Sequence, residues 1–170
     1  MKLRLTAKIH TADWRDKYVL QVGRFRDGLA KIELNGKYGY VDRQGREVVA
    51  LKYDSLEDFA YNGLAKARFN GKVGYVDVTG KEVVALKYDS VGSFRGGLAA
   101  IQLNGQWGFV DKTGKEVIEP KYDSVENFHD GLVEAKLNGR QLYVDRQGGE
   151  YKGMTKVEAL KQIEAVKRRL

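Results

Sequence analysis

Hydrophobic and polar residues alternate in short runs, and the runs recur along the chain. In the first copy they cover about residues 29–34, 38–42 and 47–51. Alternation with a period of two predicts half-buried β-strands. The copies open at four glycines spaced 35, 34 and 34 residues apart: Gly28, Gly63, Gly97 and Gly131. A period in this range is typical of a repeat architecture.

Two kinds of turn separate the predicted strands. The first is an Asn-Gly dipeptide, at Asn35-Gly36, Asn70-Gly71, Asn104-Gly105 and Asn138-Gly139. It supplies the two positive φ angles of a type I′ turn and predicts a two-residue hairpin. The second is Asp-x-x-Gly, at Asp42–Gly45, Asp77–Gly80, Asp111–Gly114 and Asp145–Gly148. This spacing fits a type I turn followed by a left-handed glycine.

A two-residue turn fixes the pairing of the first hairpin. It places Leu34 opposite Lys37, Ile32 opposite Gly39 and Ala30 opposite Val41. One face is then small and apolar: Ala30, Ile32, Leu34, Gly39 and Val41. The other mixes rings and charges and is expected to meet solvent in part: Lys31, Glu33, Tyr38 and Tyr40. A glycine in mid-strand, at 39, 74 and 108, suggests that another backbone or ring approaches closely there.

The third strand of each copy runs into the pattern KYDS-V/L-x-x-F, whose rings are expected to pack one repeat on the next. Before the first copy, residues 1–10 alternate as a strand and residues 17–27 match the second half of a repeat. After the last, Thr155 and Glu158 form a capping-box pattern. Apolar residues follow at helical spacing: Val157, Leu160, Ile163 and Val166.

The prediction is an all-β antiparallel hairpin-repeat solenoid with a C-terminal capping helix; the alternative is a closed four-bladed propeller-like array. The array covers residues 1–151: a strand (1–10), a half repeat (17–27), three repeats (28–62, 63–96, 97–130) and a partial repeat (131–151). Residues 152–170 form the amphipathic helix, packed as a cap. In the partial repeat Gln141-Leu142 fills the slot that holds Trp107-Gly108 earlier, and atypical terminal repeats act as caps.

Composition narrows the function. The 170 residues contain no cysteine, which excludes thiolate chemistry and a disulfide scaffold. The net charge is +7, but residues 28–151 hold 17 basic and 18 acidic side chains, so the excess belongs to the two ends. A nucleic-acid-binding array would carry a basic stripe along its repeats. Residues 1–20 lack the apolar segment of a signal peptide, and a cytoplasmic location is expected.

The motifs resemble the WG-repeat family of bacterial proteins. The resemblance rests on G-L-A, N-G-K/Q, Trp107-Gly108, the G-Y/F-V-D that follows, T/Q-G-K/R-E-V and K-Y-D, over about residues 17–150. It departs at Tyr38 and Val73, where the family has Trp, and at Gln141-Leu142. It implies an all-β repeat with an interaction role, and it carries no shared catalytic residues.

Each chemically suggestive group has a structural explanation. The four Asp-x-x-Gly aspartates are separate turn residues, whereas calcium needs six to eight clustered oxygens. Two histidines, His10 and His129, are too few for a zinc site. The Lys-Tyr-Asp triplets at 52–54, 87–89 and 121–123 recur three times, whereas an enzyme concentrates its chemistry at one asymmetric site. No catalytic, cofactor or metal residue is therefore expected.

We expect a non-catalytic scaffold for protein–protein interaction whose partner is not identified. The candidate partner-binding residues are the rings of the mixed face and the variable loop positions: Tyr38, Tyr40, Tyr75, Trp107, Phe109, Tyr61, Arg95 and His129. The rings have the alternative of being core between adjacent repeats. The rival functions are glycan or cell-wall binding by an aromatic ladder and, less favoured, nucleic-acid binding by the basic ends. No membrane partner is expected.

Overall fold

The computed structural model describes residues 23–169. The predicted strand 1–10 and the first part of the half repeat, residues 17–22, lie outside the described residues. The chain divides between Leu86 and Lys87 into two compact units. Each unit is built from antiparallel hairpins.

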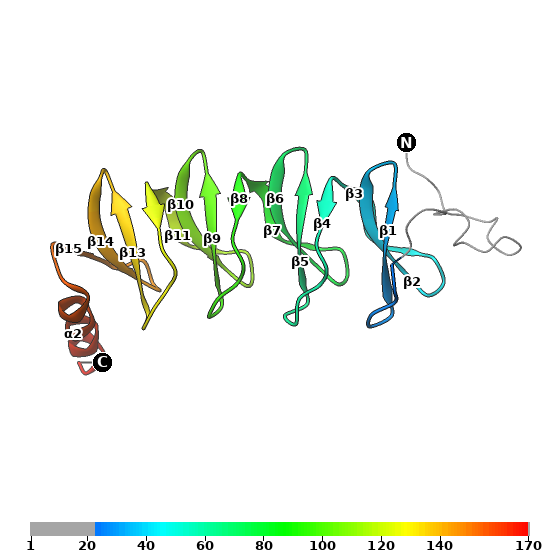
Figure 1. Cartoon of the computed structure of the whole chain (residues 1–170). Helices are drawn as coiled ribbons and strands as arrows, with labels where there is room; N and C mark the ends of the chain where they lie inside the picture. The colour runs from blue at the N-terminus through cyan, green and yellow to red at the C-terminus, as the bar shows by residue number, and fades with distance from the viewer. Residues whose placement is uncertain (1–22, 170) are drawn as a thin grey trace, which may run out of the picture. The chain divides into compact units, whose positions relative to one another are not determined.

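The first unit holds a complete three-stranded sheet and most of a four-stranded one (Figure 1). The three-stranded sheet has the order β1-β2-β3, with β1 Leu29–Leu34, β2 Lys37–Asp42 and β3 Glu47–Tyr53. The four-stranded sheet has the order β4-β5-β6-β7, with β4 Ser55–Leu56, β5 Leu64–Phe69, β6 Lys72–Asp77 and β7 Glu82–Tyr88.

The second unit holds two further four-stranded sheets and the helix. One sheet has the order β11-β10-β9-β8, with β8 Ser90–Val91, β9 Leu98–Leu103, β10 Gln106–Asp111 and β11 Glu116–Tyr122. The other has the order β12-β13-β14-β15, with β12 Ser124–Val125, β13 Leu132–Leu137, β14 Arg140–Asp145 and β15 Glu150–Lys152. The helix α2 covers Lys156–Lys167.

The hairpin predictions are confirmed. β1 pairs with β2 through Leu34↔Lys37, Ile32↔Gly39 and Ala30↔Val41, the register derived from the two-residue turn. All four turn asparagines have φ angles of 50–52°, in the left-handed region that a type I′ turn requires. They are Asn35, Asn70, Asn104 and Asn138. Gly23 N–H donates to the Lys31 carbonyl at 2.8 Å, as Gly92 N–H does to the Ala100 carbonyl, a contact that fits the predicted half repeat.

The mid-strand glycines mark a bulge. Tyr38 pairs with Tyr53 and Tyr40 pairs with Val49, so β3 uses four residues where β2 uses two. The extra backbone crosses Gly39, where a Cβ atom would lie 2.7 Å from the Val49 carbonyl oxygen. The strand then continues past its own sheet, and its extension begins the next sheet as β4. The expected close approach of another backbone is therefore confirmed.

The fourth sheet lacks this bulge because Leu142 occupies the glycine slot. β14 and β15 pair without a register shift, through Leu142↔Lys152, Tyr143↔Tyr151 and Val144↔Glu150. β15 is only three residues long, and Gly153 follows it with a φ of 66°. The chain then turns into α2 instead of entering a fifth sheet.

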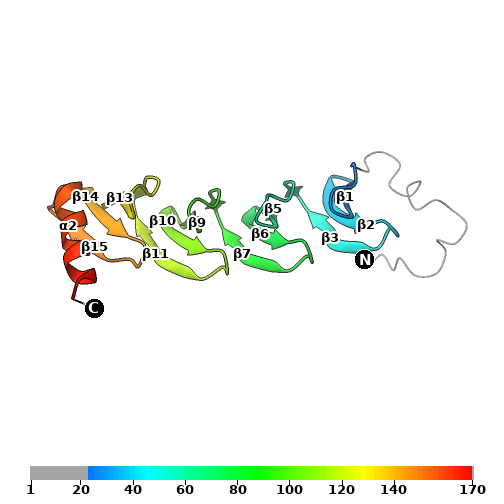
Figure 2. The ribbon, with the colours of Figure 1, turned by 90° about the horizontal axis from the view of Figure 1, so that it is seen from below.

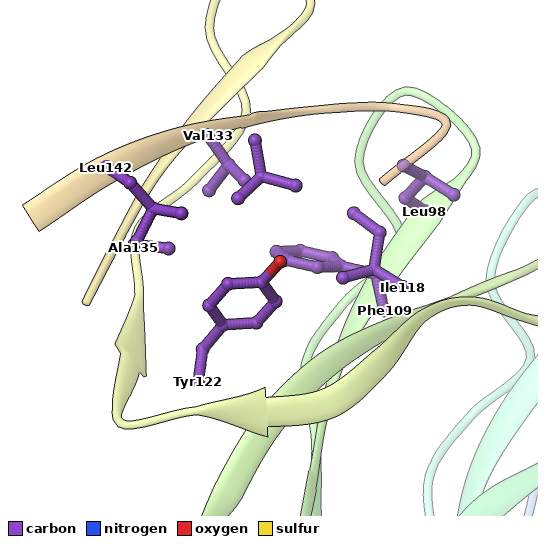
Figure 3. Packing of buried hydrophobic residues seen from close by; sticks show 8 residues of the cluster. Leu98, Phe109, Ile118, Tyr122, Val133, Ala135 and Leu142 are labelled. Carbon is purple, nitrogen blue, oxygen red and sulfur yellow. The ribbon is translucent and has the colours of Figure 1, made fainter. Parts of the chain in front are cut away.

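Within each unit, the ring-bearing face of one hairpin packs against the small apolar face of the next hairpin. In the first unit Tyr40 and Tyr53 of one repeat pack with Ala65, Ala67 and Val76 of the next. In the second unit the rings of Phe109 and Tyr122 pack with Val133, Ala135 and Leu142 in the same way (Figure 3). The mixed face was expected to meet solvent in part, but Tyr40 is only 5% exposed, because the small face of the following repeat covers its ring.

The tyrosine rings of the KYDS-V/L-x-x-F pattern pack on the following repeat as predicted, but its phenylalanine rings stack within their own repeat. Phe59 stacks on Tyr40 with ring centroids 4.8 Å apart, and Phe128 meets Phe109 at 4.9 Å. Tyr122 is 1% exposed and lies at the centre of the cluster in Figure 3. Tyr122 thus packs against the following repeat, whereas Phe59 and Phe128 contact rings of their own repeat from the segment that leads into the next sheet.

The predicted helix and its capping box are confirmed. Thr155 N–H donates to the Glu158 carboxylate at 2.8 Å, and Glu158 N–H donates back to the Thr155 hydroxyl at 3.3 Å. α2 lies beside the sheet β12–β15 (Figures 1 and 2). Its buried side is centred on Ala159, which is inaccessible to solvent. The predicted stripe is only partly right, because Val157 and Val166 are more than half exposed.

The architecture is an all-β antiparallel hairpin repeat with one C-terminal helix, the fold class predicted from the sequence as a solenoid. None of the four sheets closes into a barrel. Residues 23–169 hold four repeats, and the first and third of them bury aromatic residues against the following repeat instead of in cores of their own. This is the packing rule of repeat proteins.

Candidate functional site

The four Asp-x-x-Gly carboxylates accept hydrogen bonds from residues of their own turns. Asp77 Oδ1 accepts from Thr79 N–H at 2.8 Å, the Thr79 hydroxyl at 2.6 Å and Lys81 N–H at 3.1 Å. Asp111 repeats these three contacts with Thr113 and Lys115. The turn closes through Gly80, whose N–H donates to the Asp77 carbonyl at 2.9 Å with a φ of 85°. The expected turn-capping role is therefore confirmed.

These contacts also explain the acidity of the turn carboxylates. The pKa of Asp77 is lowered mainly by the hydrogen bond from the Thr79 hydroxyl, with some opposition from desolvation. For Asp42, desolvation raises the pKa, but hydrogen bonds from Arg46 and Gln44 outweigh it and the net shift is downward. Donors that bind the ionised form stabilise it. The shifts reflect turn structure and do not indicate a reactive group.

The Lys-Tyr-Asp triplet joins each repeat to the next. The Tyr88 hydroxyl donates to Glu116 Oε1 at 2.6 Å, and Lys87 Nζ lies 2.8 Å from the same oxygen. Tyr122 and Lys121 bind Glu150 in the same way, at 2.8 and 2.9 Å. In each pair the glutamate belongs to the G-K/R/G-E segment of the following repeat. We call this contact the Lys-Tyr/Glu latch.

The aspartate of the triplet binds the hairpin turn of the following repeat. Asp54 Oδ2 accepts from Asn70 N–H and Asp89 Oδ2 from Asn104 N–H, both at 2.7 Å. Asp123 Oδ2 accepts from Gly139 N–H at 2.8 Å. All three side chains of the triplet thus have a packing role, which accounts for its threefold repetition.

The latch shifts the pKa of both partners. Burial, reinforced by the hydrogen bond to Glu150, raises the pKa of Tyr122 well above its usual range. Hydrogen bonds from Lys152, Lys121 and Tyr122 lower the pKa of Glu150 to about 2. Perturbed groups of this kind are found at catalytic sites and also in structural ion pairs. Here the same arrangement recurs at Glu116, so the structural interpretation fits.

The structure separates the candidate partner-binding rings into two groups. Tyr40, Tyr75 and Phe109 are 4–6% exposed, so their rings belong to the core, and the prediction that they form a contact surface is corrected. Burial raises the pKa of Tyr75 to about 12, with a smaller contribution from Glu57. Tyr38 and Trp107 are half-buried and pack on the edge of the same clusters.

The three variable loop residues are exposed. Tyr61 is fully exposed, at 113% of the reference value. Arg95 and His129 occupy equivalent positions, since each donates its backbone N–H to the leucine three residues later at 2.8 Å. The loop at Tyr61 is one residue longer, and it closes through Ala60 N–H and the Leu64 carbonyl at 3.0 Å.

A cavity of about 450 Å³ lies beside this longer loop, in the first unit. The sequence interpretation did not include its basic residues, Arg24 and Arg26. Two signals could have indicated them. First, both arginines flank Phe25, whose counterparts in later repeats directly precede a loop. Second, the spacing from Gly28 to Gly63 is 35 residues where the other spacings are 34, which places an inserted residue in the neighbouring loop.

Among residues 23–169, no group of three or more His, Asp or Glu side chains has the geometry to hold a metal ion. Within the same range no helix is long and apolar enough to cross a membrane.

Comparison with curated proteins gives no match. Among solved structures the chain is similar to "KlHsv2 with loop 6CD replaced by a Gly-Ser linker", at 10% identity and a TM-score of 0.42. That similarity covers 72% of this chain and 46% of the other, so this chain spans less than half of that structure's length.

Comparison with family models matches four successive stretches to the family described as "WG containing repeat". The matched residues are 21–38, 38–72, 74–107 and 107–140. They follow the repeat spacing and take in the first three hairpins, the bulge glycines and every latch residue described above except Glu150. Since the matches cover more than half of the chain, it belongs to the WG-repeat family.

Proposed function

We propose that this protein is a non-catalytic repeat scaffold for protein–protein interaction. The observation that carries the proposal is how the repeated polar side chains are used. The Asp-x-x-Gly carboxylates bind their own turns, and the Lys-Tyr-Asp triplets bind the following repeat. The repeated groups that resemble acid–base machinery are thus engaged in holding the fold together.

Three loop positions that differ between repeats are exposed to solvent. Tyr61, Arg95 and His129 occupy one loop slot and carry three unlike side chains. A rigid repeat framework that presents variable loops is a usual arrangement for binding sites. Large side chains such as Tyr and Arg are enriched at the energetic centres of protein interfaces.

The rival glycan-binding function depended on an exposed aromatic ladder. Tyr40, Tyr75 and Phe109 are buried, and the following repeat covers the rings of Tyr40 and Phe109. Sugar recognition by stacking needs an accessible ring face. The burial of these three rings weakens the sequence observation that motivated this alternative and leaves the half-buried Tyr38 and Trp107 as its candidate rings.

The proposal is tested by site-specific photo-crosslinking. A photoreactive phenylalanine analogue at position 61, 95 or 129 is expected to capture one partner protein reproducibly. The same analogue at Val157, which is 59% exposed on α2, is the control. The purified partner should then bind the unmodified chain saturably. The proposal fails if capture is equal at all four positions or if the captured protein shows no saturable binding.

A further inference from the structure

The cavity in the first unit is lined by two loops of successive repeats. One is the 23–28 loop, and the other contains Asp58 and Phe59. Its apolar lining includes Leu29, Phe59 and Val78, and Val78 is 45% exposed. A volume of about 450 Å³ lies within the range of sites that hold small ligands or a few peptide side chains.

The described lining of the cavity has more basic than acidic residues, and only some of them form ion pairs. Among the lining residues that the structure describes, three of the five charged ones are basic: Arg24, Arg26 and Lys31, against Asp27 and Asp58. Lys31 is neutralised by Asp58 at 2.7 Å, and this pair lowers the pKa of Asp58. No ion pair to Arg24 or Arg26 is found within residues 23–169, and both are exposed. Arg26 acts electrostatically on Asp58 and helps to lower its pKa, but neither guanidinium group is held in an ion pair within that range, so both can bind an added carboxylate.

The neighbouring loop adds an exposed ring. It carries the one extra residue of the 35-residue spacing, and the fully exposed Tyr61 lies two residues after Phe59, a lining residue. Of the equivalent loops within residues 23–169, this one is longer than those at Arg95 and His129. The insertion therefore distinguishes the loop beside the cavity from its counterparts.

We propose that this cavity binds a short acidic peptide segment of a partner protein. An aliphatic side chain of the peptide fills the apolar lining formed by Leu29, Phe59 and Val78. A neighbouring Asp or Glu pairs with Arg24 or Arg26, because guanidinium groups bind carboxylates through two parallel hydrogen bonds. The proposal rests on the proposed scaffold function and specifies its partner chemistry.

Charge argues against the chain's own N-terminal segment as the occupant. Residues 1–22 contain five Lys or Arg and two Asp. A basic segment gains no electrostatic attraction from a cavity with two unpaired arginines. An acidic partner segment is complementary to it.

The test is an NMR titration of the ¹⁵N-labelled full chain with three blocked pentapeptides. The first has Leu at the centre and two acidic residues on each side. The second replaces the acidic residues with Lys, and the third replaces the Leu with Gly. We expect the first peptide to shift the amides of residues 23–31 and 57–63. The other two should bind at least tenfold more weakly.

The variant Arg24→Glu/Arg26→Glu should lose at least tenfold in affinity for the acidic peptide while keeping its melting temperature. The matched control is Lys112→Glu/Lys115→Glu, which makes the same charge change at an exposed turn of the second unit. Its affinity should stay within twofold of the unaltered chain. The proposal is overturned if the acidic peptide does not bind, if it shifts other residues, or if both double variants weaken binding equally.

The two proposals fail in different ways. If the partner captured by crosslinking binds the Arg24→Glu/Arg26→Glu variant with unchanged affinity, the cavity is not its binding site and the scaffold function stands. If no partner is captured and the acidic peptide still binds as described, the cavity assignment stands and the loop-presenting scaffold is refuted.

Discussion

At the scale of single residues, the bulge glycines determine where a repeat continues. A Cβ atom at Gly108 would lie 2.4 Å from the Ile118 carbonyl oxygen, which is backbone and cannot rotate away. The fourth repeat has Leu142 at this slot, and its strands pair without the bulge. The residue at this one slot therefore distinguishes a repeat whose third strand continues into the next sheet from a repeat whose third strand ends.

Replacing a bulge glycine should cost stability. Gly108→Ala is expected to lower the free energy of unfolding by about 2–3 kcal/mol, because overpacking forces the bulged strand to move. Chemical denaturation measures the loss. Gly92→Ala is the control, since its Cβ would meet nothing closer than 3.6 Å and its φ is not positive. It should change stability by about 0.5 kcal/mol or less; equal losses would contradict the steric explanation.

The two aromatic residues that flank Gly108 should differ in the same measurement. Phe109 is 4% exposed, so Phe109→Ala should cost about 3–5 kcal/mol. Trp107 is half-buried at the edge of the same cluster. Trp107→Ala should cost about half as much, because part of the ring already contacts water. A larger loss for Trp107 than for Phe109 would show that the edge ring is the main packing contact.

At the scale of elements, α2 is held by a narrow buried side. Ala159 is inaccessible, and Lys156 Nζ lies 2.8 Å from Oδ2 of Asp130, the last residue of the third repeat. A small residue at 159 lets the helix backbone come close to its neighbour. These contacts agree with the predicted capping role, which stays a prediction until the helix is perturbed.

A matched pair of substitutions tests the cap. Ala159→Arg should destabilise the chain by about 2–4 kcal/mol, because a long charged side chain cannot fit at the closed position. Ala165→Arg makes the same change on the exposed side of the helix and should have almost no effect. Thermal melts followed by circular dichroism compare the two. If both variants melt at the temperature of the unaltered chain, α2 is not a cap.

Local sequence patterns predicted the strands and their register better than they predicted what each strand packs against. Asn-Gly fixed the register of β1 and β2 because a type I′ turn leaves one pairing. Alternation also predicted a mixed face, but it does not distinguish a side that meets water from one that meets another repeat. Tyr40 was therefore expected at a contact surface and is buried. The latch partner of Tyr88 is 28 residues away at Glu116, and no local pattern identifies it.

The cavity was missed for a related reason. Its lining combines Arg24 and Leu29 with Phe59 and Val78, which come from different repeats. Spacing along the chain does not show that these residues lie together. The inserted residue near Tyr61 was visible as the 35-residue spacing, but its proximity to a cavity became apparent only in the folded chain.

At the scale of the whole molecule, the repeats are joined by the same polar contact. Lys52 Nζ lies 3.4 Å from Glu82 Oε1, and the Lys-Tyr/Glu latches at Glu116 and Glu150 are closer. In a repeat protein, stability is approximately the sum of the repeats and their nearest-neighbour interfaces. A condition that weakens the latch therefore acts on several interfaces together.

Acid is such a condition. The hydrogen bonds from Lys152, Lys121 and Tyr122 lower the pKa of Glu150 to about 2, from an ordinary value near 4.3. Lys87 and Tyr88 lower the pKa of Glu116 in the same direction. A carboxylate whose pKa is lower in the folded state contributes its full stability above the unfolded pKa. That contribution is lost as the pH falls toward the folded value.

The free energy of unfolding should therefore decrease as the pH falls from about 4.5 to about 2. Glu150→Gln should cost about 1–2 kcal/mol at pH 7, after allowance for solvent screening of a side chain that is 17% exposed. Its difference from the unaltered chain should become small near pH 2, where about half of the glutamate is itself protonated. Urea unfolding at several pH values measures this convergence, with Glu164→Gln on the exposed side of α2 as the control. Parallel pH curves for the Glu150→Gln variant and the unaltered chain would mean that the latch acts through packing instead of charge.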